Sequence, residues 1–283
     1  MVKEKYGDKQ ILKDIFSKSL ELADPAKKIE KIKFDPPVGR LFFVAVGKGA
    51  GRLANSFKKT YPRKADGFVV IPENEKCYDL GFEVIKATHP IPSKRGLDAS
   101  LKILNAISKL GKDDLLIFCI SGGASALLPL PPEGFALEDE IQLNKILLGS
   151  GLSIKEMNLY RGVFSQIKGG KLALAAYPCP IINLVVSDIP GGDLSLVGSG
   201  PTFVPEMNRT ITSDLDFGPN INKFFLENKK KLIPLGDQDT TVSEKHLGIA
   251  KEVGLTVNVY LLTDTSHAGL ITAEATLEIL AEP

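Results

Sequence analysis

The sequence predicts an α/β fold in which a mainly parallel, Rossmann-like sheet lies between two layers of helices. Short apolar, β-branched runs alternate with segments of helical periodicity along most of the 283 residues, and this order is typical of parallel sheets. The runs are apolar throughout rather than at every second residue, which predicts strands buried on both faces. An apolar content of 43% is enough for a substantial core.

The individual elements follow from these patterns. The predicted strands are the runs 41–46, 67–71, 82–87, 115–120, 181–187 and 255–262. An amphipathic opening helix ends near Asp24-Pro25, and the further predicted helices are 26–33, 50–60, 94–110, 137–149, 153–176, 241–253 and 269–281. Residues 201–240 are polar and irregular. We therefore predict a first domain over 1–240 and the start of a second α/β domain over 241–283.

Charge and cysteine usage limit the partners. Lys and Arg number 35 against 34 Asp and Glu, so the net charge of +1 predicts neither a nucleic acid nor a membrane partner. Cys77, Cys119 and Cys179 show no CxxC spacing, which favours buried free thiols in a reducing compartment. No stretch suits a signal peptide or a membrane span. We expect a cytoplasmic protein, and the oligomeric state stays open.

In parallel sheets, ligands bind beyond the carboxyl ends of the strands, so the residues that follow each strand were considered first. Gly47-Lys48-Gly49-Ala50-Gly51 follows the first strand and leads into a helix. This turn suits a phosphate, although a purely structural turn is an equal alternative. Arg52 breaks the GxGxxG pattern, but a dinucleotide stays an alternative because Glu73 ends the second strand.

A second glycine-rich turn, Ser121-Gly122-Gly123-Ala124-Ser125-Ala126, follows the fourth strand. It lacks the GxSxG pattern of a nucleophile elbow. Its hydroxyl and N–H groups form a possible cradle for a carboxylate or phosphate, and the alternative is a tight turn with a serine cap.

Acidic residues follow the fifth strand. Asp188 lies at the strand tip and Asp193 five residues later, ahead of Ser199-Gly200-Pro201-Thr202. Carboxylates at this position can hold a magnesium ion that bridges phosphates, or can cap turns and helices instead.

Two further sites depend on weaker patterns. Arg161, Ser165 and Lys168 fall on one face of the predicted helix 153–176, either for binding or as a solvated face. His89, after the third strand, is an orienting or binding group, or simply exposed. His246 and His267 have no zinc-ligand spacing with it.

Taken together, these segments resemble the glycerate 2-kinase family, whose C-terminal part is called the MOFRL domain. The resemblance rests on the glycine turn at 47–50, His89-Pro90-Ile91-Pro92, the turn at 121–128, Ile167-Lys168-Gly169-Gly170-Lys171-Leu172-Ala173, Ser187-Asp188-Ile189-Pro190-Gly191 and Ser199-Gly200-Pro201-Thr202. Weaker agreement extends it over about residues 10–205.

The resemblance implies phosphoryl transfer from ATP to the 2-hydroxyl of D-glycerate, with Mg²⁺, in a cleft between two α/β domains. It implies catalytic roles for Lys48, Asp188 and Arg161, and magnesium ligation by Asp188 and Asp193. The residues expected to bind the nucleotide or substrate are Gly47, Gly49, Ser121, Gly122, Gly123, Ser125, Lys168 and Ser199. Which turn holds which ligand stays open.

Three departures from the family pattern keep alternatives open. Arg161-Gly162-Val163 replaces Arg-Lys-His, Gly191-Gly192-Asp193 replaces Gly-Asp-Asp, and the C-terminal domain's glycine-rich motifs and arginine are not found before Pro283. The chain thus resembles a truncated family member, and we expect it to fold but to be nearly inactive as a kinase. The alternatives are an NAD(P)-dependent hydroxypyruvate reductase and a noncatalytic ligand-binding relative.

Overall fold

The structure is a computed structural model that describes residues 8–76, 81–189, 193–203, 215–232 and 257–264. Within these ranges, six strands form one parallel sheet in the order β3-β2-β1-β4-β5-β6. The strands are β1 (Leu41–Val46), β2 (Asp66–Pro72), β3 (Glu83–Ala87), β4 (Leu115–Ile120), β5 (Ile181–Ser187) and β6 (Val257–Asp264). The predicted parallel α/β fold is confirmed.

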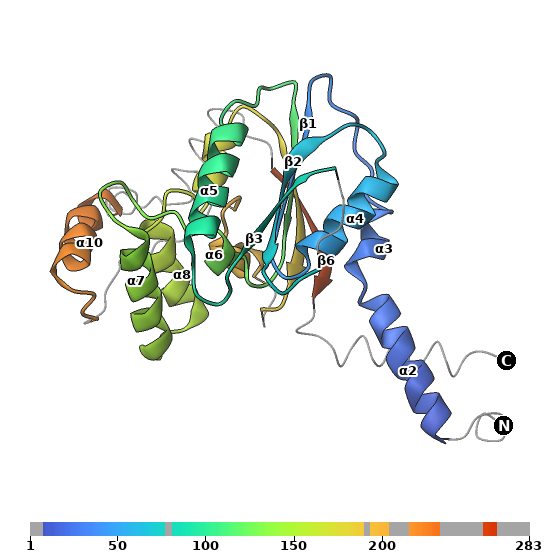
Figure 1. The fold of residues 1–283 in the computed structure, drawn as a ribbon, viewed down its shortest axis with the longest axis horizontal. Coiled ribbons are helices and arrows are strands. Elements are labelled where there is room, and N and C mark those ends of the chain that lie inside the picture. Colours follow the sequence, from blue (N-terminus) through green and yellow to red (C-terminus); the bar gives the residue numbers. More distant parts are fainter. Residues whose placement is uncertain (1–7, 77–80, 190–192, 204–214, 233–256, 265–283) are drawn as a thin grey trace, which may run out of the picture.

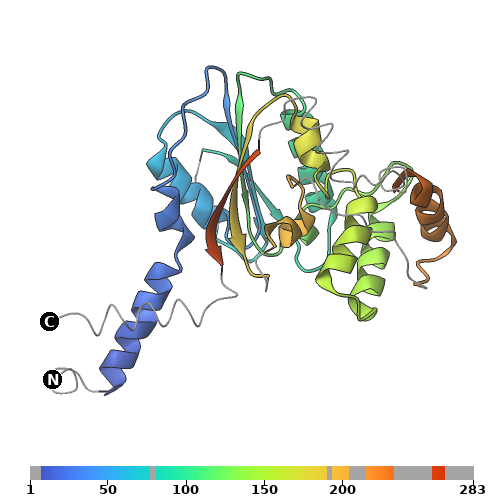
Figure 2. The ribbon, with the colours of Figure 1, turned by 180° about the vertical axis from the view of Figure 1, so that it is seen from behind.

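Helices cover both faces of this sheet (Figures 1 and 2). On one face, α3 (Pro25–Ile29) and α4 (Ala50–Thr60) share a core that includes Phe43 and Phe57. On the other face, α5 (Lys94–Ile107), α6 (Ala124–Leu127) and α9 (Lys171–Ala176) share a core that includes Phe118. The central strands β1 and β4 are buried along their whole length, which explains their uninterrupted apolar sequences.

A third core lies beside the sheet rather than on it. The helices α7 (Leu137–Gly149), α8 (Ile154–Val163) and α10 (Pro219–Leu232) lie together beside the sheet (Figure 2). They enclose an aromatic cluster around Phe164 and Tyr160. We call these three helices the helical unit. The 3₁₀ helix η1 (Leu194–Ser199) lies between α6 and α8 and so connects the helical unit to the sheet.

The structure differs from the prediction in the helix over 153–176 and in part of the stretch 201–240. The helix predicted over 153–176 is two helices, α8 and α9, separated by a loop that contains Ser165 and Lys168. Before α9, Gly169 and Gly170 adopt positive φ values of 62° and 81°, which interrupts the helix. At the end of α8, Lys171 Nζ donates to the carbonyl oxygen of Gly162 at 2.9 Å and satisfies one of the last carbonyl groups of that helix. The predicted common helical face of Arg161, Ser165 and Lys168 is therefore wrong. Helix α10 was not predicted, because its residues were interpreted as part of an irregular stretch.

The last described strand bears on the predicted domain boundary. β6 pairs in parallel with β5, so the strand that was predicted to lie within the second domain forms an edge of the first sheet. The predicted helices 241–253 and 269–281 lie outside the described residues, and the boundary at 240 stays a prediction.

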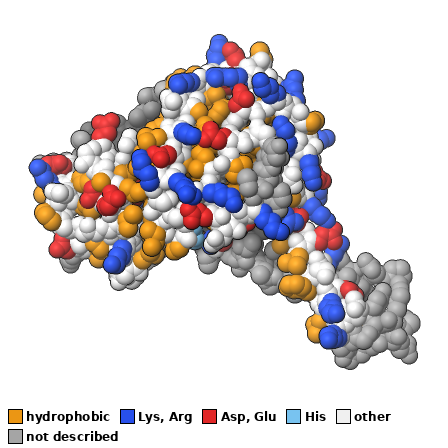
Figure 3. Space-filling view, in the orientation of Figure 1, with side chains coloured by type: hydrophobic (Ala, Val, Ile, Leu, Met, Phe, Trp, Pro, Cys, Tyr) orange, Lys and Arg blue, Asp and Glu red, His pale blue; other side chains and the backbone are white. Residues whose placement is uncertain are grey.

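The opening helix α2 (Asp8–Leu22) projects from the body (Figure 1). Its apolar side chains Leu12, Phe16 and Leu20 are exposed. On the face shown in Figure 3, Lys and Arg side chains are interspersed with Asp and Glu, in keeping with the balanced net charge. Across the described residues, no helix combines the length and apolarity needed to cross a membrane.

Candidate active site

Hydrogen bonds join the two glycine-rich turns at the carboxyl ends of β1 and β4. Lys48 N donates to the carbonyl oxygen of Gly122 at 3.0 Å, and Gly49 N donates to Ser121 Oγ at 3.0 Å. Gly47 has a φ of 123°, and a Cβ at this position would lie 2.2 Å from Ser121 Oγ. Only glycine leaves room for Ser121 to come so close to position 47. The buried Ser121 hydroxyl accepts the hydrogen bond from Gly49 and so stabilises the turn. The tight turn considered from sequence is observed, but Ser121 accepts from Gly49 N of the first turn and does not cap α6, whose N-terminus has no side-chain cap.

With the two turns joined in this way, the Lys48 side chain is exposed beside the second turn. A Cβ on Gly123, where φ is 89°, would lie 3.4 Å from Lys48 Cγ and 3.2 Å from His89 Nε2. The Lys48 ammonium has no hydrogen-bond or ion-pair partner within the part of the chain that the structure describes. The side chains that follow β1 and β3 therefore meet at the turn that follows β4.

Burial and the nearby Lys48 charge both lower the pKa of His89. The imidazole is accordingly neutral at pH 7, and one ring nitrogen can accept a proton. Sequence inspection could not separate this histidine from an ordinary exposed loop residue.

Asp188 adds a carboxylate to the same turn from the end of β5. A Cβ on Gly122 would lie only 2.3 Å from Asp188 Oδ2, so the carboxylate rests on the glycine backbone. The Asp188 side chain is exposed and forms no ion pair with a described residue. Lys48, His89 and Asp188 thus come from three strand ends and surround Gly122 and Gly123. We call this group the strand-end cluster.

Asp193, the second predicted magnesium ligand, has other contacts. Its Oδ1 accepts a hydrogen bond from Ser195 N at 3.1 Å and its Oδ2 lies 3.4 Å from Lys155 Nζ. Among described residues, no three His, Cys, Asp or Glu side chains are grouped as metal ligands. Mg²⁺ nevertheless requires only one or two carboxylates when phosphates and water complete its shell. Asp188 fits that requirement better than Asp193, because Asp193 caps η1 and pairs with a lysine.

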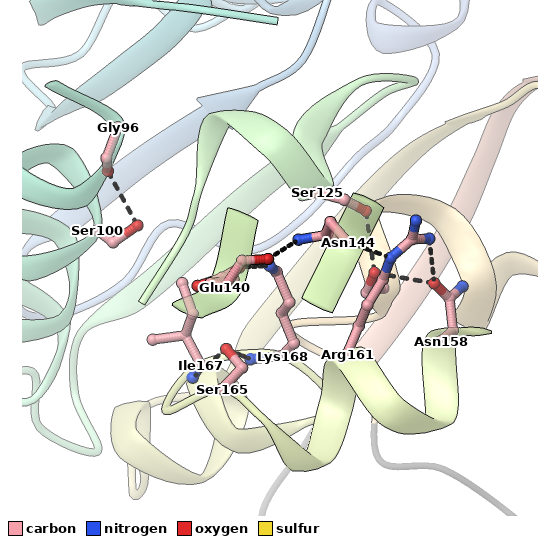
Figure 4. A network of polar contacts seen from close by, with 11 residues as sticks. Gly96, Ser100, Ser125, Glu140, Asn144, Asn158, Arg161, Ser165, Ile167 and Lys168 are labelled. Atoms are coloured by element: carbon pink, nitrogen blue, oxygen red, sulfur yellow. Dashed lines mark hydrogen bonds and ion pairs between the residues drawn. The ribbon is translucent and has the colours of Figure 1, made fainter. Parts of the chain in front are cut away.

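The remaining predicted site residues belong to a polar network between the sheet and the helical unit (Figure 4). Ser125 Oγ and Ser199 Oγ lie 2.9 Å apart, and Ser199 Oγ donates to Asn158 Oδ1 at 3.0 Å. Arg161 Nη1 donates to the same Asn158 oxygen at 3.2 Å, and Arg161 Nε donates to Asn144 Oδ1 at 2.8 Å. The network therefore runs from α6 through η1 to α8 and α7.

Lys168 ends this network inside the protein. Its Nζ donates to Glu140 Oε1, and both side chains are almost fully buried, at 2% and 1% exposed. Glu140 was not predicted, because nothing in sequence distinguishes it from its exposed neighbour Glu138. The geometry gives Lys168 a structural ion pair rather than a position in the strand-end cluster.

Comparisons with known proteins show which family the chain belongs to. A family profile for a domain of unknown function, DUF4147, matches residues 11–215. A D-glycerate 2-kinase of Thermotoga maritima is 34% identical over 198 residues, which are 69% of this chain and 47% of the relative. A glycerate 2-kinase of Picrophilus torridus is 29% identical over 80% of this chain and 59% of the relative. A protein of Agrobacterium vitis with a provisional hydroxypyruvate reductase name is 37% identical over 69% of this chain and 44% of the relative.

A solved structure has a similar fold. The crystal structure of glycerate kinase from Thermotoga maritima aligns with a TM-score of 0.72 and 27% identity, over 95% of this chain and 62% of that chain. The chain spans about half the length of the curated relatives it matches, between 44% and 59% for the three named above.

Proposed function

Because this chain belongs to the glycerate 2-kinase family defined by the DUF4147 domain, we propose that it forms the nucleotide- and substrate-binding part of an ATP- and Mg²⁺-dependent glycerate 2-kinase. The observation that carries the proposal is the strand-end cluster, in which Lys48, His89 and Asp188 surround the Gly122-Gly123 turn. A cytoplasmic location is part of the proposal, and the buried free thiols of Cys119 and Cys179 support it.

Each group of the cluster has a role that phosphoryl transfer requires. The exposed Lys48 ammonium has no partner among the described residues and would stabilise the negative charge on the transferred phosphoryl group. Gly122 and Gly123 would admit phosphate or substrate oxygens close to the backbone, where their N–H groups donate to no described residue.

Proton removal from the attacking hydroxyl requires a base, and His89 is suited to it. Its neutral imidazole lies beside Lys48 and against Gly123, within the cluster. In this role His89 would accept the proton of the glycerate 2-hydroxyl as that oxygen bonds to the γ-phosphorus of ATP and the bond from this phosphorus to the leaving ADP oxygen breaks. Asp188 would hold the magnesium ion, which when bound neutralises phosphate charge.

ATP binding to the purified chain, measured by titration calorimetry with and without Mg²⁺, tests the proposal. We expect Lys48→Met to weaken binding at least about tenfold, since charge-assisted hydrogen bonds contribute about 1.5–3 kcal/mol. Asp188→Asn should weaken binding only when Mg²⁺ is present. Equal ATP affinity in wild type and both variants would contradict the nucleotide role.

NADH serves as the competing ligand in the same titrations. The reductase alternative needs a free acid after β2 to bind a ribose, but Glu73 Oε1 lies 3.1 Å from Arg95 Nη1. Tight NADH binding without ATP binding would favour the reductase. ATP and glycerate binding without turnover is expected both for the binding part of a kinase and for the noncatalytic relative, so it does not separate these two.

A further inference from the structure

Helix α2 carries an apolar stripe that the described residues leave exposed. Leu12, Phe16 and Leu20 are four residues apart and therefore lie one above the other on one face of the helix. Their side chains are 67%, 64% and 58% exposed. A single exposed apolar side chain needs no explanation, but a continuous stripe on a projecting helix is typical of a surface that another segment covers. We call these three residues the α2 stripe.

The inner end of α2 is fixed to the body of the protein. Asp24 follows α2, and its Oδ1 accepts a hydrogen bond from Ala26 N at 3.0 Å at the start of α3. Its Oδ2 accepts from Arg52 Nη2 of α4 at 2.6 Å. Helix α3 in turn packs against β6, and Ile29 and Leu262 belong to one core. Helix α2 therefore leaves the body close to β6.

The chain that follows β6 leaves the sheet on the side to which α2 projects. β6 ends at Asp264, and α2 extends beyond the same end of the sheet (Figures 1 and 2). Residues 265–283 follow and lie outside the described residues. Within them, the sequence predicts a helix over 269–281, about 20 Å long, after a linker over 265–268 that spans up to about 14 Å. The α2 stripe is about 12 Å long, so this segment is long enough to cover it.

The predicted helix 269–281 has an apolar face that matches the stripe. Leu270, Ala273, Leu277 and Leu280 recur at intervals of three and four, as residues on one side of a helix do. This spacing is the pattern of a helix that buries one side against a neighbour. Packing on α2 would remove both apolar surfaces from water at once.

The charges beside the two apolar faces are complementary for one direction of packing. Lys9 and Lys13 are exposed along one side of the α2 stripe. On the predicted helix, Glu274 and Glu278 fall on the corresponding side of the apolar face. Corresponding sides face each other in an antiparallel pair of helices and lie apart in a parallel pair, so only the antiparallel pair brings lysines beside glutamates. The connections require the same direction, because α2 runs toward the body and the segment after β6 starts there.

We propose that residues 269–281 pack on the α2 stripe as an antiparallel helix and form a two-helix arm beside the sheet. Asp24 and Arg52 would connect this arm to α4, the helix that follows the Gly47-Lys48-Gly49 turn of the candidate site. The inference does not depend on the proposed function. The competing occupant of the stripe is a second copy of the chain.

Hydrogen exchange of the full chain, followed by mass spectrometry, measures the protection of residues 8–22 and 269–281. We expect Leu277→Glu to speed exchange in 8–22, and Phe16→Glu to speed exchange in 269–281. Each change should be about tenfold or more, because the burial of one Leu or Phe side chain contributes at least that factor. Thr272→Glu is the matched control, since it adds the same charge on the opposite side of the predicted helix. Equal exchange in 8–22 for wild type and Leu277→Glu would overturn the inference.

Charge reversal tests the direction of packing. Lys9→Glu combined with Lys13→Glu should speed exchange in both segments by about fivefold, because exposed ion pairs contribute little each. Adding Glu274→Lys and Glu278→Lys to the same protein should restore the slow exchange of wild type. Exchange that stays fast in the fourfold variant would contradict the antiparallel arrangement.

Engineered cysteines separate the chain's own segment from a second copy. They are introduced together with Cys77→Ser, since the two described cysteines are buried. Oxidation should join Leu12→Cys to Leu277→Cys within one chain, which migrates as a monomer on a denaturing gel. Leu12→Cys with Leu270→Cys should not be joined, because position 270 lies about 10 Å further along the helix. Disulfide-linked dimers of Leu12→Cys, without a link inside one chain in the double variant, would assign the stripe to a second copy and overturn the inference.

Discussion

Two lysines beside glycines have opposite environments in this molecule. Lys48 lies between Gly47 and Gly49, and its exposed ammonium has no partner among described residues, whereas Lys168 precedes Gly169 and Gly170 and is buried against Glu140. In the strand-end cluster, the glycines bring backbones together and leave the charges free. Beside the helical unit, Lys168 in the loop after α8 pairs with Glu140 of α7 and holds these two segments together. A lysine in a glycine-rich segment is therefore a ligand-binding candidate only if its charge has not already been paired.

The largest effect expected from this comparison is the loss of the buried pair. Lys168→Met leaves Glu140 charged and buried without its partner, and such a loss costs about 3–5 kcal/mol in free energy of unfolding. Lys48→Met should change that free energy by no more than about 0.5 kcal/mol. Urea unfolding followed by circular dichroism measures both values. Replacing both members of the pair, in Lys168→Met with Glu140→Leu, should recover most of the loss. If Lys168→Met and Lys48→Met lower the free energy of unfolding by similar amounts, the two lysines do not differ in the way proposed.

The next effect is a loss of stability in acid, from the Arg40–Asp114 pair at the amino ends of the central strands. Hydrogen bonds from Arg40 are the main cause that lowers the pKa of Asp114 to about 2. Because the folded pKa lies below the unfolded value, the stabilisation is present above about pH 4 and is lost as the pH falls toward 2, by about 2 kcal/mol in total. Unfolding free energies at stepwise pH, compared between wild type and Asp114→Asn, measure the difference. A gap between the two proteins that stays constant from pH 5 to pH 2 would argue against this assignment.

A comparable loss is expected from Gly123→Ala. The alanine would have to adopt a φ of 89° and would lie 3.2 Å from His89 Nε2, so we expect a cost of about 1–3 kcal/mol. The same variant should displace His89 and Lys48 and weaken ATP binding. Gly134→Ala is a matched control, because Gly134 also has a positive φ, of 85°, but no atom within 4 Å of its Cβ position. Equal ATP affinity in the two variants would show that the contact with His89 is unimportant.

The smallest effect on stability is expected from Gly122→Ala. The new methyl group would collide with Asp188 Oδ2, which is the end of an exposed and rotatable side chain, so the cost should stay below about 1 kcal/mol. The displaced carboxylate should nevertheless reduce magnesium-dependent ATP affinity as Asp188→Asn does. Calorimetric titration with and without Mg²⁺ tests this. A uniform loss under both conditions would indicate that the turn itself, rather than Asp188, is disturbed.

The sequence predicts the parts of the molecule that depend on local patterns. The strands around the site and the helix over 50–60 have clear periodicity and lie where they were predicted. The approach of Lys48 to Gly123 and of Asp188 to Gly122 follows from the rule that parallel strands end at one edge.

Long-range pairing could not be predicted. Glu140 and Lys168 are 28 residues apart, and neither their burial nor their pairing leaves a periodic signal. The pattern over 153–176 also continues across Gly169-Gly170 with helical spacing, although the backbone turns there. Arg161 was predicted as a site residue, but its amide partners Asn144 and Asn158 appear only in three dimensions.

The sheet order also fixes when the site can first exist during synthesis. Gly49 N donates to Ser121 Oγ, 72 positions further along the chain, because β1 lies beside β4 as well as β2 in the sheet. A ribosome adds about 5–20 residues each second, so the glycine turn after β1 waits several seconds for the serine that fixes it. Asp188 follows β5 and joins later still. The nascent chain therefore carries an exposed Lys48 loop well before it carries a place for any ligand.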